Sequence, residues 1–461
     1  MAEAVHLAYL AAAVLFIVGI MRLRQPATAR SGNLVAAAGM LLALAVTATQ
    51  ISYGNMPFIL PAVAVGAAVG AGAGRRVRMT AMPQMVALFN GMGGGAAGLV
   101  AFGEIWRGLA QGGALPLPAL VTGLVTVLIG GVSLSGSLLA FAKLQEIMTG
   151  RPILFAGQSA LNALLLAAGL AAGVDVAATS GHGALLVLLA AVALALGVGV
   201  VLPVGGADMP VIISLLNALT GLAASATGFV LANALLIVAG ALVGASGTIL
   251  TLLMARAMNR SLANVLFAGV GSVRAGGTGA AEGSVHPTNA EDVATLLAYA
   301  QRVVIVPGYG LAVARAQQEA KDLMVALEAR GVDVKFGIHP VAGRMPGHMN
   351  VLLAEADVPY DRLYEMERIN PEFERTDVAL VVGANDVTNP AARTRPDSPI
   401  YGMPILDVDR ARTVVVLKRS MAPGFAGIDN ELYLRDNCRM LFGDAKASLA
   451  ALLQALKEVD G

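Results

Sequence analysis

Charged side chains, cysteine and tryptophan are all scarce in this chain. Asp, Glu, Lys and Arg together make up 13% of the 461 residues, against a usual share of roughly 25%. The single cysteine excludes a disulfide scaffold and a metal site built from several cysteine ligands. So few charges cannot cover the surface of one soluble globule of this size, and a hydrophobic share of 57% excludes a disordered chain.

The net charge of +1 conceals two parts of opposite sign. Residues 1–260 contain 11 Lys and Arg against 5 Asp and Glu, which gives a net charge of +6. Residues 261–461 contain 20 against 25, which gives a net charge of −5. We interpret the first part as a membrane domain and the second as a soluble, mildly acidic domain. Neither part has the strongly basic patch that is typical of nucleic-acid binding.

Nine apolar stretches in the first part are each close to the ~20 residues that a helix needs to cross a bilayer. The first stretch has no cleavage-site signature and is followed at once by others, so we expect a retained helix and not a removed signal peptide. The predicted spans cover residues 4–21, 32–51, 56–73, 82–103, 116–141, 153–173, 183–202, 209–230 and 233–255.

Basic residues are unequally divided between the two ends of these spans. Of the 11, ten fall on one side, and the positive-inside rule places that side in the cytoplasm. The sequence therefore predicts a multi-pass inner-membrane protein with its N-terminus outside and its C-terminal domain in the cytoplasm. The ten are Arg22, Arg24, Arg30, Arg75, Arg76, Arg78, Lys143, Arg151, Arg256 and Arg260, and Arg107 lies on the other side.

A sequence block recurs inside the membrane domain. Residues 82–90 (MPQMVALFN) match residues 209–217 (MPVIISLLN) at an offset of 127. A later pair, Ser135-Gly136 and Ser246-Gly247, matches at an offset of 111. Both copies of the block begin on the same side of the membrane, which indicates a parallel repeat. Repeated halves are a common way to build a pathway at the interface between them.

Asn90 and Asn217 occupy the same place in the two copies, near the middle of their spans. A buried amide in hydrocarbon needs a protein partner or water. Two interpretations stay open, namely hydrogen bonding between packed helices and a hydrophilic path. Asp208 lies at the cytoplasmic mouth of the second copy, but no ionisable residue lies at mid-span. A proton path through this chain alone therefore lacks an obvious titrating group.

The second part begins with a glycine-rich segment, residues 261–289, which we interpret as a flexible linker. Strand and helix patterns then alternate, as in an open parallel α/β sheet of the Rossmann-like, doubly wound type with helices on both faces. The predicted domains are therefore a membrane domain (1–260), the linker and a nucleotide-binding domain (290–461). The predicted strands cover residues 302–306, 332–338, 363–366, 378–382, 405–408 and 413–417, and the predicted helices cover 312–330 and 448–459.

The first of these strands runs into Gly308-Tyr309-Gly310-Leu311-Ala312-Val313 and then a helix. Glycines between a strand and a helix permit a tight turn and the close approach of a pyrophosphate to the helix N-terminus. We interpret this Gly-x-Gly as a dinucleotide site. The alternative is a tight turn that binds no ligand.

The other strand ends indicate which dinucleotide binds. An NAD site usually has an acidic residue at the end of the second strand, but residues 337–340 contain none. Lys418, Arg419 and Ser420 follow a later strand, and two cations with a hydroxyl suit a 2′-phosphate. NADP is therefore favoured over NAD, the alternative being solvated surface charge. Residues 421–427 read either as a mobile flap with glycine hinges or as an ordinary loop.

Together these motifs resemble the beta subunit of the proton-translocating NAD(P) transhydrogenase family over nearly the whole chain. The matching segments are residues 306–310, 336–350 (FGIHPVAGRMPGHMN), 382–386, 418–421 and 443–446. The resemblance implies that the C-terminal domain binds NADP(H), turned over relative to the usual Rossmann pose, under a closing loop. Many relatives have Tyr where this chain has Phe425. The residues expected at the cofactor are Gly308, Tyr309, Gly310, Leu311, Ala312, Val313, Gly343, Arg344, Met345, Pro346, Gly383, Ala384, Asn385, Asp386, Lys418, Arg419, Ser420, Gly424, Phe425, Gly427, Asp444 and Ala445.

In the membrane domain the resemblance implies roles in proton transfer for Asn217, Asp208 and Arg260. Some relatives have His at the position of Asn90, and an amide cannot titrate near pH 7. The proton carrier is then a water chain past Asn90 and Asn217 or a group in a partner chain.

The family also implies an alpha subunit or subunits with the NAD(H) site and further membrane helices, in an assembly that forms a dimer. No second strand–Gly-x-Gly–helix unit occurs in this sequence, so NAD(H) is expected on the partner. The predicted function is hydride transfer between NAD(H) there and NADP(H) here, coupled to proton translocation and forming NADPH, with no catalytic side chain and no metal. The alternative is a transporter or channel with a nucleotide-sensing Rossmann domain.

Overall fold

The chain divides into two compact units, one of helices and one built around a sheet, and each is described by itself. The structure is a computed structural model. It describes residues 2–23, 26–50, 53–77, 81–111, 115–145, 147–149, 152–179, 183–205, 208–257, 284–343, 347–396, 398, 400–424 and 426–459.

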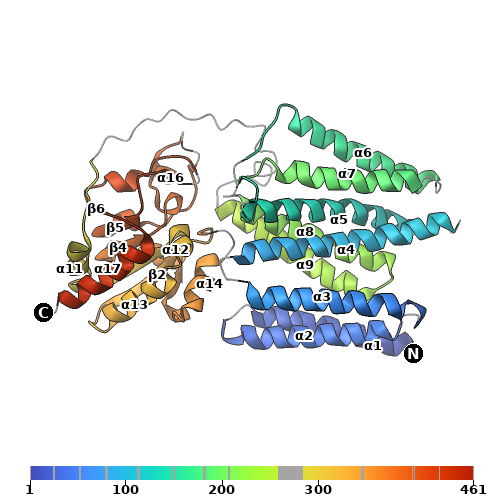
Figure 1. Ribbon diagram of the computed structural model, residues 1–461, viewed down its shortest axis with the longest axis horizontal. Coiled ribbons are helices and arrows are strands. Elements are labelled where there is room, and N and C mark those ends of the chain that lie inside the picture. The colour runs from blue at the N-terminus through green and yellow to red at the C-terminus, as the bar shows by residue number, and fades with distance from the viewer. Residues whose placement is uncertain are drawn as a thin grey trace. The chain divides into compact units, whose positions relative to one another are not determined.

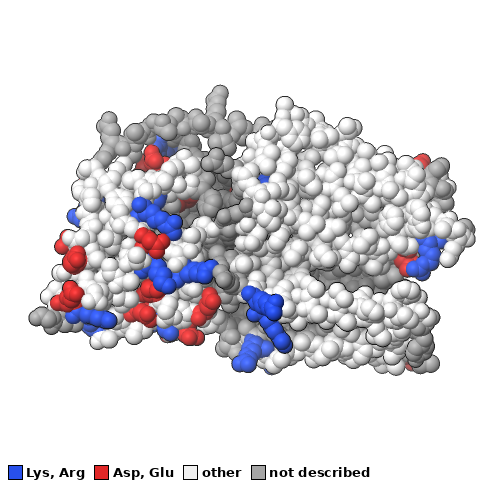
Figure 2. All heavy atoms as spheres, in the orientation of Figure 1, with Lys and Arg blue, Asp and Glu red and all other residues white. Residues whose placement is uncertain are grey.

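The helical unit contains nine long apolar helices within its described residues, as the hydropathy pattern predicts (Figure 1). Their length and composition are those of membrane-spanning helices. On the helical unit, Figure 2 shows few charged side chains, and those lie near helix ends. The helices are α1 (Ala2–Leu23), α2 (Pro26–Ala48), α3 (Met56–Arg76), α4 (Met82–Ala110), α5 (Leu117–Leu144), α6 (Gln158–Thr179), α7 (Gly183–Val201), α8 (Met209–Val230) and α9 (Ala234–Ala257), with a short 3-10 turn, η1 (Tyr53–Asn55).

Small residues let these helices pack closely, and the contacts follow the sequence repeat. A Cβ added to Gly94 of α4 would lie 2.8 Å from the Ser133 Cβ of α5. A Cβ added to Gly221 of α8 would lie 2.4 Å from the Gly244 nitrogen of α9. The two glycines differ by the 127-residue offset and their partners by the 111-residue offset. Van der Waals packing of small residues is how helices associate in lipid, and here both copies use it at matching positions.

The second unit is a six-stranded sheet with the order β3-β2-β1-β4-β5-β6, and every neighbouring pair is parallel. This order and the helical unit confirm the predicted fold class. The strands are β1 (Arg302–Pro307), β2 (Asp333–Ile338), β3 (Leu363–Glu365), β4 (Val378–Val382), β5 (Thr413–Lys418) and β6 (Cys438–Phe442). The helices are α11 (Ala290–Ala298), α12 (Tyr309–Ala314), α13 (Gln317–Glu328), α14 (His348–Glu355), α15 (Met366–Ile369), α16 (Ala391–Thr394) and α17 (Ala445–Glu458), and the 3-10 turns are η3 (Tyr360–Arg362), η4 (Asn370–Arg375), η5 (Asp386–Thr388), η6 (Val408–Arg410) and η7 (Glu431–Leu434).

The central strands are buried on both faces because both faces are covered. All five residues of β4 are buried, the continuous apolar run that is typical of a parallel sheet. One face packs on Ile369, Phe373 and Tyr433 from the short helical segments beside it. Figure 1 shows α13 and α17 side by side across the sheet, in contact with each other.

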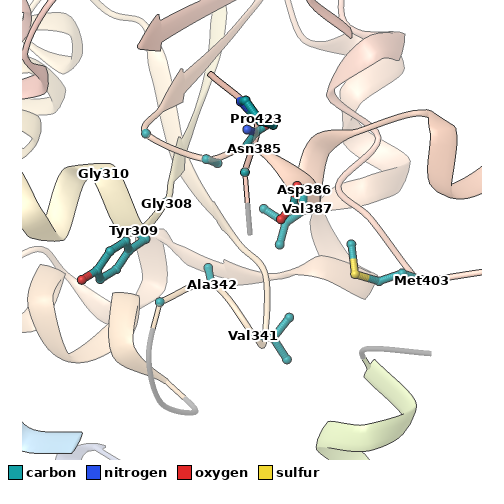
Figure 3. A pocket seen from close by; sticks show the side chains of 14 residues that line it. Gly308, Tyr309, Gly310, Val341, Ala342, Asn385, Asp386, Val387, Met403 and Pro423 are labelled. Atoms are coloured by element: carbon teal, nitrogen blue, oxygen red, sulfur yellow. The ribbon is translucent and has the colours of Figure 1, made fainter. Parts of the chain in front are cut away.

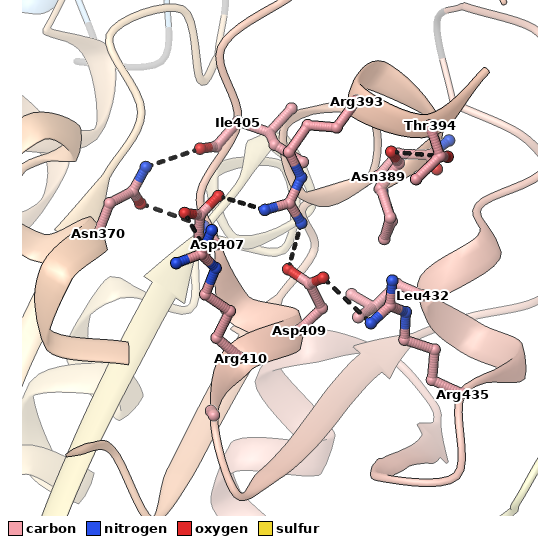
Figure 4. A network of polar contacts seen from close by, with 12 residues as sticks. Asn370, Asn389, Arg393, Thr394, Ile405, Asp407, Asp409, Arg410, Leu432 and Arg435 are labelled. Atoms are coloured by element: carbon pink, nitrogen blue, oxygen red, sulfur yellow. Dashed lines mark hydrogen bonds and ion pairs between the residues drawn. The ribbon is translucent and has the colours of Figure 1, made fainter. Parts of the chain in front are cut away.

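Two predicted elements are wrong. Residues 405–408 form no strand, because the Asn370 side chain takes the place of a strand partner (Figure 4). Its amide nitrogen donates to Ile405 O at 2.9 Å, and its oxygen accepts from Asp407 N at 3.1 Å. The predicted helix 312–330 is two helices, since Arg315 adopts a left-handed conformation with φ of 51° between α12 and α13.

The sixth strand, β6, is missing from the sequence-based prediction. It pairs with β5 from Cys438 to Phe442. Its other edge accepts the segment before α11, with Thr288 N donating to Met440 O at 2.9 Å and Met440 N donating to His286 O at 2.8 Å. The last residues of the predicted linker therefore lie along this edge, while residues 261–283 fall outside the described part of the chain.

Candidate functional site

The candidate site lies where the strand order reverses, between the carboxyl ends of β1 and β4. Ligands of open parallel sheets bind at such a point. Two backbone hydrogen bonds join the turns that follow the strands. Gly308 N donates to Val382 O, and Gly310 N donates to Gly383 O, each at 2.9 Å. The crevice thus has a floor made of backbone.

Glycine is required in this floor by close contact between the two turns. A Cβ added to Gly308 would lie 2.3 Å from Ala384 Cα, and one added to Gly310 would lie 2.7 Å from Gly383 Cα. Gly383 itself has φ of +68°, in the left-handed region that favours glycine. The Gly-x-Gly motif therefore serves the packing of the turns, and the same packing leaves bare backbone facing the crevice.

A first cavity of about 400 Å³ opens over this floor. Figure 3 shows the side chains of Val341, Asp386 and Met403 arranged around it. Its walls come from the ends of β1, β2 and β4 and from the segments 400–404 and 421–424. It is lined by Gly308, Tyr309, Gly310, Val341, Ala342, Gly343, Gly383, Ala384, Asn385, Asp386, Val387, Met403, Pro423 and Gly424.

A second cavity of about 280 Å³ continues from the first and shares four lining residues with it, Gly310, Gly383, Ala384 and Asn385. Its further lining comes from α12, the end of β5 and the start of α17, namely Val313, Leu417, Lys418, Arg419, Ser420, Gly443 and Ala445. Joined, the two cavities reach the size range of ligand sites. The structure therefore brings the Gly-x-Gly turn and the Lys418-Arg419-Ser420 group to one crevice, although about 110 residues separate them in the sequence.

Lys418 bridges several elements at this end of the crevice. Its Nζ donates to Ala422 O and lies 5.0 Å from the centre of the Tyr433 ring. Nζ and Gly424 N also lie 3.0 and 2.7 Å from one terminal atom of the Asn385 amide, and two donors assign that atom as the oxygen. Burial lowers the pKa of Lys418, while the carboxylates of Asp386 and Asp429 act in the opposite direction.

Arg419 and Ser420 are exposed beside Lys418. The Arg419 guanidinium pairs with Asp444 at 3.1 Å, and both side chains are largely accessible. Asp444 also caps α17, because its carboxylate accepts from Lys446 N at 3.1 Å. An exposed pair contributes little stability, so Arg419 is free to exchange this carboxylate for a phosphate.

The loop after Ser420 lies against the two polar residues that follow β4. Ala426 N donates to Asp386 Oδ2 at 3.0 Å. A Cβ added to Gly424 would lie 2.5 Å from Asp386 Oδ1, so only glycine lets the loop come this close. Gly427 ends this stretch with φ of +70°. The loop is thus closed onto Asn385 and Asp386 at the rim of the first cavity.

His339 holds the other rim of the first cavity. It is buried at the end of β2, where its Nε2 lies 2.8 Å from Pro404 O and its Nδ1 accepts from Val341 N at 3.2 Å. These contacts place the proton on Nε2. Burial lowers the pKa of His339 to about 4, although the Pro404 carbonyl and Glu367 favour the charged form. A neutral histidine therefore links Val341 to the segment that carries Met403.

The remaining predicted cofactor residues have varied positions. Leu311 and Ala312 are buried in the core and line neither of the two cavities. Arg344, Met345, Pro346 and Phe425 fall outside the described residues.

Sequence reasoning missed Met403 and Tyr433. Met403 belongs to an irregular segment with no motif. Tyr433 is a buried aromatic residue whose link to Asn385 appears only in the fold, where the assigned Asn385 amide nitrogen donates to Tyr433 Oη at 2.9 Å.

A second polar cluster lies in the helical unit. Asn90 of α4 is buried, and its Nδ2 donates to Ser137 Oγ of α5 at 3.0 Å. Ser133, one turn earlier on α5, donates to Leu216 O of α8 at 3.1 Å and contacts the Thr220 hydroxyl. The cluster links three helices without an ionisable group among these side chains.

The other predicted proton residues differ from Asn90 in their surroundings. Asn217 is partly exposed, and its side chain makes no hydrogen bond to another residue in the described part of the chain. Asp208 is buried just before the first turn of α8, where a helix dipole favours an acidic residue. Arg260 lies outside the described residues. Asn90 thus has defined side-chain partners on α5, Ser133 and Ser137.

Comparison with known proteins gives a consistent result. Residues 5–455 match a family model described as NAD(P) transhydrogenase beta subunit. Two sequences described as NAD(P) transhydrogenase subunit beta, both from Rhodospirillum rubrum, are each 49% identical to this chain over 456 residues. The match covers 97% of this chain and 98% of each relative.

Proposed function

The chain belongs to the NAD(P) transhydrogenase beta subunit family, and from that premise we propose how its residues carry out the reaction. It is a multi-pass membrane subunit of an oxidoreductase that couples hydride transfer involving NADP(H) to proton translocation, and it requires an alpha subunit. We assign the cofactor site to the sheet unit and the proton residues to the helical unit.

NADP(H) binds in the crevice between β1 and β4. The observation that carries this assignment is the junction of the two cavities, one floored by the Gly-x-Gly backbone and one ended by Lys418, Arg419 and Ser420. Bare backbone at a helix N-terminus suits the pyrophosphate, and two cations with a hydroxyl suit the 2′-phosphate. No carboxylate follows β2, where an NAD site would have one.

The side chains of this chain bind and orient the cofactor, and none acts as an acid, base or nucleophile. When bound, the nicotinamide supplies the redox chemistry by exchanging a hydride with NAD(H) held by the alpha subunit. Asn385 and Asp386 hold the 421–427 loop over the first cavity. That loop excludes water and must open for the cofactor to leave.

Proton transfer runs through the membrane domain, residues 1–260, past Asn90, Asn217, Asp208 and Arg260. The Asn90–Ser137 pair supports this path because it is a buried polar cluster in an apolar unit. Since amides do not titrate near pH 7, water or a group of the alpha subunit carries the proton. Residues 261–289 form the linker. It transmits the conformational change that accompanies proton transfer to the NADP(H) domain, residues 290–461.

Orientation follows from the basic residues, of which ten of 11 lie on one side. The N-terminus is outside and the NADP(H) domain is in the cytoplasm, in an inner membrane. Protons then enter from outside as NADPH forms. One charge moving through about 150 mV gives about 3.5 kcal/mol, which shifts the equilibrium by a few hundredfold. Two copies of the whole assembly form a dimer.

Vesicles that contain this chain and its alpha subunit test the proposal. With NADH and NADP⁺ present, a proton gradient directed toward the side of the NADP(H) domain should accelerate NADPH formation, and an uncoupler should abolish the acceleration. NADPH formation that is indifferent to the gradient would refute the coupling. Equal affinity for NADP⁺ and NAD⁺ would separately refute the assignment of the cationic end of the crevice.

A further inference from the structure

Gln84 has a buried side-chain amide whose nitrogen has a hydrogen-bond partner and whose oxygen has none among the described residues. It is the third residue of α4 and only 8% exposed. Its Nε2 donates to Leu144 O at the end of α5, at 3.1 Å. Its Oε1 is buried and has no donor among the residues that the structure describes. A buried acceptor without a donor is costly, and native proteins commonly satisfy such a group with an ordered water.

Gln84 contacts the same neighbouring helix, α5, as Asn90 does. The two residues are six positions apart, which is about 9 Å along a helix axis. Positions 84 and 90 are about 120° apart around the helix, but both are buried and both side chains donate to α5, at Leu144 O and Ser137 Oγ. The acceptor of Gln84 thus lies between the mid-span pair Asn90–Ser137 and the end of the helices.

Lys143 marks that end of the helices. It is buried near the end of α5, and its Nζ donates to the carbonyls of Val201, Leu202 and Val204 at 3.3, 2.6 and 2.8 Å. Three acceptors match the three N–H groups of an ammonium. Lys143 is therefore a fixed cation that holds the end of α7, and it has no donor left for a mobile water.

The second copy of the repeat lacks both groups. By the 127-residue offset, Val211 is the second-copy equivalent of Gln84. By the 111-residue offset, Met254 is the equivalent of Lys143. Val211 and Met254 are buried, as Gln84 and Lys143 are. The mid-span asparagine is present in both copies, but at this end of the helices only the first copy has polar side chains at these two positions.

We propose that Gln84 is a further residue of the proton route, and that on this side of the membrane the route follows the first repeat only. Its Oε1 accepts from a water that relays protons between the Asn90–Ser137 pair and the end of α5. A proton that joins this water on one side leaves from another of its O–H bonds, so Gln84 gains and loses no proton. The inference rests on the proposed proton path and adds a residue to it.

The test uses the complete complex with its alpha subunit in sealed proteoliposomes containing a pH-sensitive dye. Gln84→Leu removes the acceptor at similar volume, and Gln84→Glu keeps acceptor oxygens while it removes the donor to Leu144. Val211→Leu is the matched control in the second repeat. Proton uptake and NADPH formation are recorded together, and NADP⁺ affinity is measured in the same preparations.

Gln84→Leu should lower proton uptake and coupled NADPH formation at least tenfold while NADP⁺ affinity changes less than twofold. Gln84→Glu should retain most of the rate, and Val211→Leu should equal the unmodified complex. Gln84→Met replaces Gln84→Leu if the latter does not assemble.

Unchanged proton uptake in the apolar variant overturns the inference. Equal losses in the apolar variant and Gln84→Glu, with equally lowered melting temperatures, also overturn it, because the amide then only caps α5. If the unmodified complex moves no protons, both the proposed function and this inference fail. That result is seen without any substitution, so it is distinct from the two outcomes in the Gln84 variants.

Discussion

Arg419→Ala is the substitution that separates NADP(H) recognition from nucleotide binding in general. In the structure the Arg419 guanidinium is paired with Asp444 at 3.1 Å, and the side-chain exposures are 64% and 43%. Such an exposed pair is worth about 0–1 kcal/mol. Its loss should therefore leave the fold intact, and any large effect must come from a lost contact with ligand.

The expected magnitude follows from the two partners that compete for the guanidinium. A charge-assisted hydrogen bond to a phosphate contributes about 1.5–3 kcal/mol. Subtracting the pair with Asp444 leaves a net loss of about 0.5–3 kcal/mol. The Kd for NADP⁺ should therefore rise by roughly 2- to 150-fold. NAD⁺ has no 2′-phosphate, so its Kd should change by less than about twofold.

Asp444→Asn provides the matched control. The amide oxygen still accepts from Lys446 N at the start of α17, but the charge that competes for Arg419 is gone. NADP⁺ binding should then be unchanged or tighter by up to about fivefold. Isothermal titration of the purified full-length chain with NADP⁺ and NAD⁺ measures all these values. Equal weakening of both dinucleotides by Arg419→Ala would refute the reasoning.

Three further predictions concern the crevice and its rims. Gly308→Ala should abolish NADP⁺ binding and lower the melting temperature, because its Cβ would lie 2.3 Å from Ala384 Cα and overpacking costs about 1–3 kcal/mol or more; normal binding would contradict the account. Tyr433→Phe removes the hydroxyl that accepts from Asn385, so we expect the free energy of unfolding to fall by about 1 kcal/mol. NADP⁺ release in stopped-flow experiments should become faster. Burial lowers the pKa of His339 to about 4, below the ~6.5 of the unfolded chain, so the unfolded chain binds more protons between these values. Stability should be complete above pH 6.5 and fall by up to about 3 kcal/mol toward pH 4, and His339→Gln should flatten the dependence of melting temperature on pH.

The membrane helices were predictable because each is a long apolar run, and length and hydropathy alone decide that such a segment is a helix in lipid. The partners of Asn90 were not. Ser133 and Ser137 of α5 follow Asn90 by more than 40 residues in the sequence. Nothing in a linear pattern states which face of α5 meets α4.

The sheet shows where a pattern of apolar residues misleads. Residues 405–408 are apolar enough for a strand, but one side chain, Asn370, satisfies the backbone that a neighbouring strand would. The true sixth strand directly follows Asp436 and Asn437, and Asp and Asn favour a turn. Backbone partners decide strand membership, and they are set by tertiary structure.

In the crevice, residues with a chemical signature were predictable and residues with a purely spatial role were not. Gly308 and Lys418 could be picked out because backbone access and positive charge are what a nucleotide phosphate needs. Met403 has no such signature and reaches the first cavity only because Asn370 and His339 hold its segment in place. An ion-pair network continues that support (Figure 4), in which Arg393 pairs with Asp407 at 2.8 Å.

The central claim is that hydride transfer and proton movement are one coupled process. Its most direct test records NADPH formation and proton uptake at the same time in sealed proteoliposomes that contain this chain and its alpha subunit. The account predicts a constant ratio of protons to NADPH as NADH concentration is varied. NADPH that accumulates across a sealed membrane without any proton movement would contradict it.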